Sequence, residues 1–398
     1  MRIVHFFERV RLEKGGTIRA AIDMCLAMAE RGHHVSLATF DDTDVPEEWR
    51  SGAPSPGPSW PEVKMISPPP LPGGFYPPGG PTCTKTILAG ADVVHLHGLW
   101  QPSTAQYAAR AADAGVPIVL SCHGMLDEWS MRQSTAKKKV YLGLFGRKFL
   151  DRVSVFHATA DDEKRQASAW VPGDKIEAIP LLADFGPYRE LPGPEIAVNE
   201  FGLDTNAFYA LFLSRLHYKK QPDVLIKAVS KLRKQGQDVR LLLAGGGDEP
   251  YVDQLKSRAK AEGFDDDTCK FLGMVTGDTK LSVYQAADTF ALPTSQENFG
   301  MVFVEALACG TPIVATKGTD IWRELDATGG TTLAEATPDA FAQAIGGLVG
   351  KKQELPAIGA TARERVFEWL DADTIAKRYE AMYERAVNAK PSITGSTR

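Results

Sequence analysis

The segment Thr294–Thr316 constrains the fold more than any other part of the sequence. It passes from a strand end through a glycine turn into an apolar helix, which stops at Gly310 before another apolar strand. Glu305 is the one charged residue in that helix, and Glu297 lies eight residues earlier, at its start. A helix that is apolar on nearly every side is expected to be buried. A buried carboxylate needs a partner, such as a cation or a ligand rich in hydroxyl groups.

Length and composition exclude several classes of protein. A chain of 398 residues suits two domains, and 43% hydrophobic with 24% charged residues is ordinary for a soluble protein. A net charge of −5 argues against a nucleic-acid binder. No apolar run approaches the ~20 residues of a membrane span, and the N-terminus has the pattern of a strand rather than a signal peptide. The five scattered cysteines form no Cys-x-x-Cys pair, which argues against a zinc site or a disulfide framework and favours the reducing cytoplasm.

Strand and helix patterns alternate through both halves of the chain, which predicts parallel sheets covered by helices on both faces. We expect two doubly wound, Rossmann-like domains, 1–190 and 191–370, and a C-terminal segment, 371–398, comprising a helix and a disordered tail. Ligands of such sheets bind beyond the carboxyl ends of the strands, so the expected site is a cleft between the two domains. The expected strands are 2–7, 34–40, 63–66, 92–97, 117–122, 153–159, 176–179, 209–213, 240–244, 270–272, 289–293 and 312–315. The expected helices are 17–31, 104–114, 130–150, 161–170, 222–235, 250–263, 279–287, 301–309, 338–349 and 370–387, with a linker at 184–205 and an irregular stretch at 51–81.

Several polar or glycine-rich positions follow predicted strands. Gly15 and Gly16 precede a helix, where they could admit an anion at its N-terminus or simply form a turn. Arg215 and Lys220 follow one strand; two cations there could hold a diphosphate, although on local sequence alone a solvated basic loop is the simpler explanation. The glycines from Gly245 end another strand and fit either nucleotide approach or a plain turn.

Histidines also end two strands. His123 stands in Ser-Cys-His-Gly, while His95 and His97 form a His-x-His pair. Each could donate a hydrogen bond to a sugar or phosphoryl oxygen, or be structural. A metal site is disfavoured because no carboxylate or third histidine lies nearby in the sequence.

The two glutamates do not fit a glycosidase pair. Eight helical residues span ~12 Å and leave the side chains about 80° apart, whereas glycosidase carboxylates stand ~5–9.5 Å apart. The spacing suits two contacts along one elongated ligand. A buried ion pair of Glu305 with a lysine or arginine is the structural alternative.

Taken together, these motifs resemble glycosyltransferase family 4, the retaining GT-B enzymes that use nucleotide sugars, over essentially the whole chain. The match of Glu297-Asn-Phe-Gly-Met-Val-Phe-Val-Glu305 to the family's glutamate, seven residues, glutamate element is the most specific. Arg215-Leu with Lys220, Gly15-Gly16 and His123-Gly124 resemble its phosphate-binding pair, glycine loop and active-site histidine.

The resemblance implies a division of roles. Arg215 and Lys220 would neutralise the diphosphate, and Glu305 would bind the donor ribose. Glu297 and His123 would contact the donor sugar. The terminal helix would cross back to the N-terminal domain. Further donor contacts would come from Gly15, Gly16, Gly245, Met274, Val275, Asn298, Phe299, Gly300 and Met301.

The implied reaction is hexosyl transfer with retention, without a metal or other cofactor, to a sugar or lipid-linked acceptor in bacterial polysaccharide or glycoconjugate synthesis. Alternatives are a GT-B nucleotide-sugar epimerase or hydrolase, and a non-catalytic nucleotide-sugar-binding protein. Ser214 replaces the family's usual glycine, and Pro180-Leu-Leu-Ala-Asp184 replaces its Pro-Asn-Gly-Val-Asp turn. The donor base and sugar, the acceptor, the linkage and the oligomeric state are not determined by these motifs.

The stretch 132–152 interleaves lysines and arginines with apolar residues. It could lie on an anionic bilayer surface, placing a cytoplasmic protein at the inner face of the membrane. It could equally be an amphipathic helix packed on its own domain.

Overall fold

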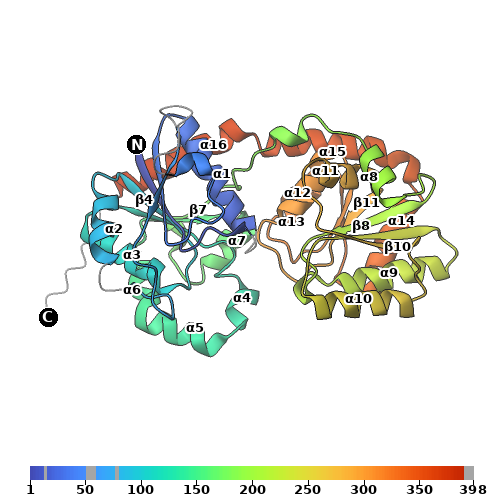
Figure 1. Cartoon of the computed structure of the whole chain (residues 1–398), viewed down its shortest axis with the longest axis horizontal. Helices are drawn as coiled ribbons and strands as arrows, with labels where there is room; N and C mark the ends of the chain where they lie inside the picture. The colour runs from blue at the N-terminus through green and yellow to red at the C-terminus, as the bar shows by residue number, and fades with distance from the viewer. Residues whose placement is uncertain (13–15, 51–59, 77–79, 390–398) are drawn as a thin grey trace. The chain divides into compact units, whose positions relative to one another are not determined.

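The computed structural model describes residues 1–12, 16–50, 60–76 and 80–389. Contacts divide the chain into two α/β units, coloured by residue number in Figure 1. Unit 1 comprises Met1–Asp184 together with the C-terminal segment from Ala372, and unit 2 comprises Phe185–Asp371. The predicted tail overlaps 390–398, which lies outside the described residues.

The sheet of unit 1 has seven parallel strands in the order β3-β2-β1-β4-β5-β6-β7. The chain moves outward from β1 to β3 and then returns to the other side of β1, so the strand order reverses between β1 and β4. Ligands of doubly wound sheets bind beyond the strands at such a reversal. The strands are β1 (Arg2–Phe6), β2 (His34–Thr39), β3 (Glu62–Met65), β4 (Val93–His97), β5 (Ile118–Ser121), β6 (Val155–Ala158) and β7 (Ile176–Ala178).

The two faces of this sheet differ in chemistry because successive side chains of a strand alternate between faces. One face carries apolar residues such as Val4 and Phe6, which belong to a core that also contains Phe149. The opposite face carries His5, His95 and further polar residues that meet α16. The helices of unit 1 are α1 (Gly16–Glu30), α2 (Gly80–Leu88), α3 (Pro102–Asp113), α4 (Glu128–Arg132), α5 (Thr135–Tyr141), α6 (Arg147–Arg152), α7 (Asp161–Ala167) and α16 (Ala372–Asn388).

The single helix predicted over 130–150 is wrong, because the chain breaks it at Ser134. Gln133 is extended and Ser134 has a φ of 52°, so α4 ends and α5 starts in a new direction. A π-helical turn, Leu142–Gly146, then joins α5 to α6. The basic residues suited helix throughout, and the periodicity concealed the break at Ser134.

Unit 2 contains six parallel strands in the order β10-β9-β8-β11-β12-β13, and here the order reverses between β8 and β11. The strands are β8 (Phe208–Leu213), β9 (Val239–Ala244), β10 (Cys269–Gly273), β11 (Thr289–Ala291), β12 (Ile313–Ala315) and β13 (Thr331–Leu333). The helices are α8 (Glu195–Phe201), α9 (Pro222–Lys234), α10 (Glu249–Ala261), α11 (Gly277–Ala286), α12 (Met301–Ala308), α13 (Trp322–Ala327), α14 (Pro338–Val349) and α15 (Leu355–Trp369). The two-sheet α/β fold predicted from the sequence is therefore confirmed.

The predicted linker 184–205 contains a helix, α8, between Pro194 and a left-handed Gly202. It is anchored on α11, where the Ser282 hydroxyl accepts a hydrogen bond from the Ala197 backbone N–H. The sequence also left α2, α13, α15 and the three-residue strand β13 unassigned. The six-residue helix α13 and the three-residue strand β13 are short, and elements of that length depend on tertiary contacts more than on local pattern.

All five cysteines are free thiols in the structure. Within the described ranges, no helix combines the length and apolarity needed to cross a bilayer.

Candidate functional site

Three strand-end loops of unit 2 are bound to one another by backbone hydrogen bonds. Ser214 N–H donates to the Ala244 carbonyl (3.1 Å), and Gly245 N–H donates to the Gly273 carbonyl (2.7 Å). Gly245 has a φ of 126°, and a Cβ there would lie 2.0 Å from the Ser214 carbonyl oxygen. The close approach of the loop after β8 therefore requires a glycine at position 245, whether or not a nucleotide binds there.

Lys220 and Glu297 form an ion pair beside this junction, linking the loops after β8 and β11. Both side chains are largely buried, at 12% and 19% exposure. Burial, with the positive charges of Lys219 and Arg215, lowers the pKa of Lys220 to about 7. An anion arriving here would favour the charged form of the lysine.

Arg215 is exposed, and it has no ion-pair partner among the residues the structure describes. It follows β8, where the strand order of this sheet reverses. The backbone around Lys219 is fixed, since its carbonyl accepts hydrogen bonds from the Ser295 N–H (3.1 Å) and hydroxyl (3.2 Å).

Glu297 and the start of α12 are held in place by the next loop. Glu297 N–H donates to the Gly318 carbonyl (2.8 Å), and the Asn298 amide donates to Asp320 (3.1 Å). Gly300 has a φ of 65°, and a Cβ there would lie 2.8 Å from Glu297 Cγ. Because helix N-termini present unpaired N–H groups, α12 offers donors to an oxygen-rich ligand next to this pair, beginning at Met301.

Phe299 cannot offer its side chain to a ligand. Its ring is 3% exposed and stacks on Trp369 at a centroid distance of 5.8 Å. Only its backbone remains available for the predicted donor contact.

Glu305 has both oxygens occupied. Lys280 donates to Oε1 and the Tyr284 hydroxyl to Oε2, each at 3.0 Å. Burial raises the pKa of Tyr284, so its hydroxyl stays a donor. The ion-pair alternative therefore describes this structure, and ribose hydroxyls would have to share or displace these partners. Lys280 gave no sequence signal, because it lies on a different helix.

The two residues predicted to border the base have opposite exposures. Met274 is 74% exposed, whereas Val275 is 8% exposed. A Cβ on Gly246 would lie 3.4 Å from Met274 Cε, so Met274 reaches the loop after β9. Met274 is thus the side chain that a planar base could meet.

In unit 1, His123 follows β5 in a left-handed conformation with a φ of 51°. Such a backbone is uncommon for a residue other than glycine and is concentrated at functional sites. Gly124, next to it, donates its N–H to the buried Glu163 carboxylate (2.6 Å). Gly16 begins α1, while Gly15 lies outside the described residues.

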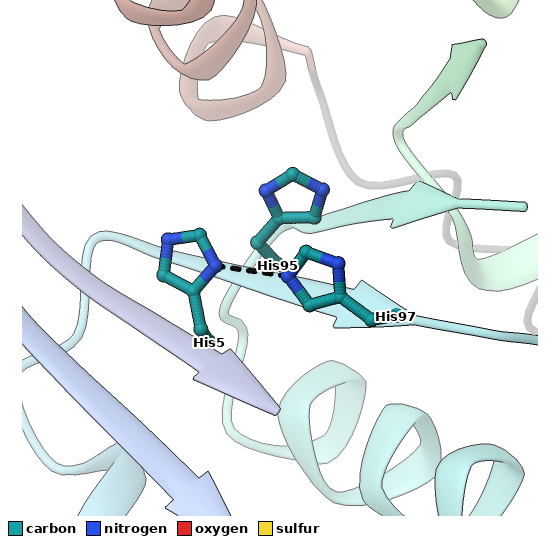
Figure 2. Close-up of side chains that lie close together, drawn as sticks. All are labelled: His5, His95 and His97. Carbon is teal, nitrogen blue, oxygen red and sulfur yellow. Dashed lines mark hydrogen bonds between the residues drawn. The ribbon is translucent and has the colours of Figure 1, made fainter. Parts of the chain in front are cut away.

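Four further histidines, buried on one face of the sheet, lie beside His123: His5, His95, His97 and His157. Sequence reasoning missed His5, although the order β2-β1-β4 pairs it with His95 across neighbouring strands. Figure 2 shows His5 on one strand and His95 with His97 on the next. Their nitrogens lie within 4.8 Å of one another, so the third histidine that seemed absent from the sequence is present in space.

Hydrogen bonds already occupy both nitrogens of His95. His157 Nε2–H donates to the Ile179 carbonyl (2.8 Å), which leaves His157 Nδ1 to accept from Ser121 Oγ (2.6 Å). Ser121 then accepts from His95 Nε2–H (2.7 Å), and His95 Nδ1 accepts from the Tyr383 hydroxyl (2.8 Å). A metal ion bound at His95 would have to break this chain.

The same chain anchors α16 on unit 1. Tyr383 and Tyr379 are both fully buried, and the Tyr379 hydroxyl lies 3.0 Å from His157 Nε2 and donates to the Pro180 carbonyl (3.2 Å). Arg31, directly after α1, adds an ion pair with Glu380 (2.9 Å).

Two parallel doubly wound sheets, with polar residues gathered after the strands where the order reverses, define a GT-B glycosyltransferase fold. A solved structure of HepE from Anabaena, in complex with UDP and glucose, has this fold with a TM-score of 0.74; the match covers 96% of this chain and 99% of that one at 19% identity.

The model of the family "Glycosyl transferases group 1" matches residues 195–365, and that of the "Glycosyl transferase 4-like domain" matches residues 15–181. The phosphatidyl-myo-inositol mannosyltransferase of Mycolicibacterium smegmatis is 30% identical over 314 residues, 77% of this chain and 74% of that protein. The chain belongs to the group 1 glycosyl transferases, glycosyltransferase family 4.

The D-inositol 3-phosphate glycosyltransferase of Segniliparus rotundus is 31% identical over 215 residues, 52% of this chain. The match spans 47% of that relative, so the chain covers about half of its length.

Proposed function

We propose that the protein is a retaining, metal-independent glycosyltransferase, which moves a hexosyl group from a nucleoside-diphosphate sugar to a hydroxyl group of a sugar or lipid-linked acceptor. The observation that carries this proposal is the grouping of Arg215, the Lys220–Glu297 pair and the N-terminus of α12 after β8 and β11. A departing diphosphate gains negative charge as the glycosidic bond breaks, and fixed cations and helix N–H groups stabilise it. The similarity to inositol-phosphate and phosphatidylinositol transferases supports the substrate class.

We propose the following roles for these residues. Arg215 and Lys220 bind the diphosphate, Glu297 and the backbone of residues 298–301 hold the sugar, and Met274 meets the base. The exposed guanidinium of Arg215 can take two phosphate oxygens at once. His123 donates a hydrogen bond to a donor oxygen from unit 1. Because two cations already face the leaving group, its charge is met without a metal ion.

The test of function is a labelled sugar donor incubated with the protein and a set of acceptor hydroxyls. Transfer of label to an acceptor, with the anomeric configuration retained by NMR, supports the proposal. Epimerised or hydrolysed donor would indicate the alternative GT-B activity. Binding without turnover would indicate a nucleotide-sugar-binding protein, and the absence of both would contradict the proposal.

The donor nucleotide is identified by thermal shift with UDP, GDP and ADP and their common sugar conjugates. A ligand at about 100 times its Kd adds about 2.7 kcal/mol of stability. We expect one nucleotide to raise Tm in wild type and to do so less in Glu305→Ala. Lys280→Ala serves as the matched variant, since it removes the partner of Glu305 but retains the carboxylate. Equal shifts of Tm in all three proteins would contradict a contact between Glu305 and the ribose.

We also propose that the 132–152 segment contacts anionic lipid, which would bring a cytoplasmic enzyme to a lipid-linked acceptor. Leu142, Phe149 and Leu150 are buried in unit 1, but Val140 (61%) and Leu144 (63%) point outward, with Phe145 half-exposed beside Phe75. The same segment carries six exposed cations: Arg132, Lys137, Lys139, Arg147, Lys148 and Arg152. Charge and apolar exposure together suit a bilayer interface.

Sedimentation with liposomes tests this contact. Wild type should bind vesicles in which about a third of the lipid is anionic, and it should not bind neutral vesicles. Added salt should weaken the binding. The double variant Val140→Ser/Leu144→Ser should lose binding, whereas Val387→Ser on α16, which also removes an exposed apolar side chain, should retain it. Equal behaviour with both vesicle types would end the proposal.

A further inference from the structure

A second chain of hydrogen-bonded histidines runs from the core of unit 1 to His123. His5 Nδ1 lies 3.0 Å from His97 Nε2, the contact drawn as a dashed line in Figure 2. His97 Nδ1 lies 3.2 Å from His123 Nε2. His5 and His97 are buried, while His123 is partly exposed. The proposed function assigns a role to His123 and none to the other two.

The three rings meet edge to edge. Their planes are inclined by only 16° between His5 and His97 and by 15° between His97 and His123, with centroids 5.3 and 5.5 Å apart. In both pairs the distance between the ring centroids exceeds the distance between the two nitrogens by roughly the width of a ring. Each pair of nitrogens therefore points at the other, which is the geometry of a direct N–H···N bond.

Burial keeps these rings neutral. It lowers the pKa of His5 and of His123 to about 3 and that of His97 well below its usual value. The groups facing them from packed elements are His95 on β4, His157 on β6 and Tyr383 on α16. None of these carries a charge that would favour a second proton on an imidazole.

A neutral imidazole has one N–H, so three rings supply three protons for two contacts. If His97 carries its proton on Nδ1, His123 must accept on Nε2 and carry its own on Nδ1, and His5 must donate from Nδ1. If His97 carries it on Nε2, His5 and His123 must also be Nε2–H. Every other assignment places two protons or two lone pairs in one contact.

The surroundings of His5, at the buried end of this hydrogen-bonded chain of histidines, decide between these two states. His5 Nε2 is buried and has no hydrogen-bond partner among the described residues. In the Nε2–H state this atom would be an unsatisfied N–H in the core, whereas in the Nδ1–H state it is an unshared lone pair. Orphaned buried N–H groups are the rarer of the two defects. The third proton therefore belongs on His123 Nδ1, at the partly exposed end.

We propose that His5 and His97 are positioning residues that hold His123 as its Nδ1–H tautomer and so make it a fixed hydrogen-bond donor to an oxygen of the bound donor substrate. The inference rests on the proposed function for the identity of that substrate. His123 carries this ring on a left-handed backbone, a conformation concentrated at functional sites, and its tautomer is set before the ligand arrives.

The first test is the tautomer itself, measured by long-range ¹H–¹⁵N NMR of the full chain with ¹⁵N-labelled histidine at pH 7.5. His123→Gln identifies the His123 signals by their loss. We expect a protonated Nδ1 and an unprotonated Nε2 on His123 of wild type. The reverse assignment would overturn the proposal, and this result does not depend on whether the protein transfers sugar.

The second test is a pair of variants at His97. His97→Asn retains an amide N–H near the position of Nδ1, whereas His97→Leu removes the donor. We expect His97→Leu to mix the tautomers of His123 and to lower kcat about tenfold or more, by analogy with the loss seen when the partner that orients a metal-ligating histidine is removed. KM for the donor should change little, and His97→Asn should restore both readouts. A folded His97→Leu with wild-type kcat and tautomer would contradict the proposal.

The third test is a titration with zinc chloride, because the nitrogens of His5, His95 and His97 lie near enough to one another to bind a metal ion. Their imidazole signals should be unchanged by one equivalent of Zn²⁺. A stoichiometric shift of all three would overturn the hydrogen-bonded chain and identify a metal site in its place.

Discussion

Lys220→Met should lower kcat by about 10²–10³-fold, equivalent to about 3–4 kcal/mol of transition-state stabilisation, the usual cost of removing one electrostatic donor from a reacting centre. Methionine retains most of the buried volume and removes only the charge. Lys231→Met on the following helix α9, where the lysine is exposed and paired with Asp339, is the matched control and should be near neutral. The measurement is steady-state transfer with the nucleotide sugar that the thermal-shift panel identifies.

A purely structural ion pair would give a different result, and a double-mutant cycle separates the two explanations. Removing one partner of a largely buried pair leaves the other charge uncompensated, and removing both relieves that cost. If the pair is only structural, Lys220→Met/Glu297→Gln should recover both stability and activity. If Lys220 holds the leaving diphosphate, the double variant recovers stability and stays inactive. Recovery of activity would contradict the proposed site.

Acid should destabilise unit 1 well before unit 2. Burial lowers the pKa of His5 and His123 to about 3, and lowers those of His95, His97 and His157 as well. These groups stay neutral in the folded state and take up protons on unfolding below about pH 6.5. The stabilisation is therefore fully present above that pH and is lost as pH falls toward the folded pKa values.

The expected loss between pH 7 and 5.5 is about 1 kcal/mol per histidine, or on the order of 5 kcal/mol for the five. Glu163 and Glu177 oppose the shift at His157 and Arg378 supports it, so His157 should contribute least. Hydrogen exchange, corrected for intrinsic rates, measures the loss separately in β4, β5 and α16. Unit 2, whose one histidine is His217, is the internal control.

Two outcomes would contradict this account. Equal pH dependence of exchange in both units would mean that the buried histidines are not the cause. Protection of α16 that persists at pH 5 would mean that Tyr379 and Tyr383 do not depend on neutral His157 and His95. His34→Gln is the control variant, because His34 is exposed and belongs to neither hydrogen-bonded chain of histidines. It should leave the pH dependence unchanged.

The sequence by itself determined the alternation of strands and helices, and with it the two parallel sheets. It also determined that Arg215, Lys220, Glu297 and His123 would follow strands, because hydrophobic period and glycine turns are local properties of the chain. Since the carboxyl ends of parallel strands share one edge, placing Lys220 and Glu297 on two strand ends was nearly enough to bring them together.

Only the tertiary structure decided which side chains would meet. His5 and His97 are 92 residues apart, and strand order and register make them neighbours. Lys280 reaches Glu305 from another helix, and Tyr383 reaches His95 from the far end of the chain. The break at Ser134 and the helix α8 likewise arise from packing. Local pattern fixes where a side chain leaves the backbone, but its partner, its burial and hence its protonation depend on segments that the pattern does not contain.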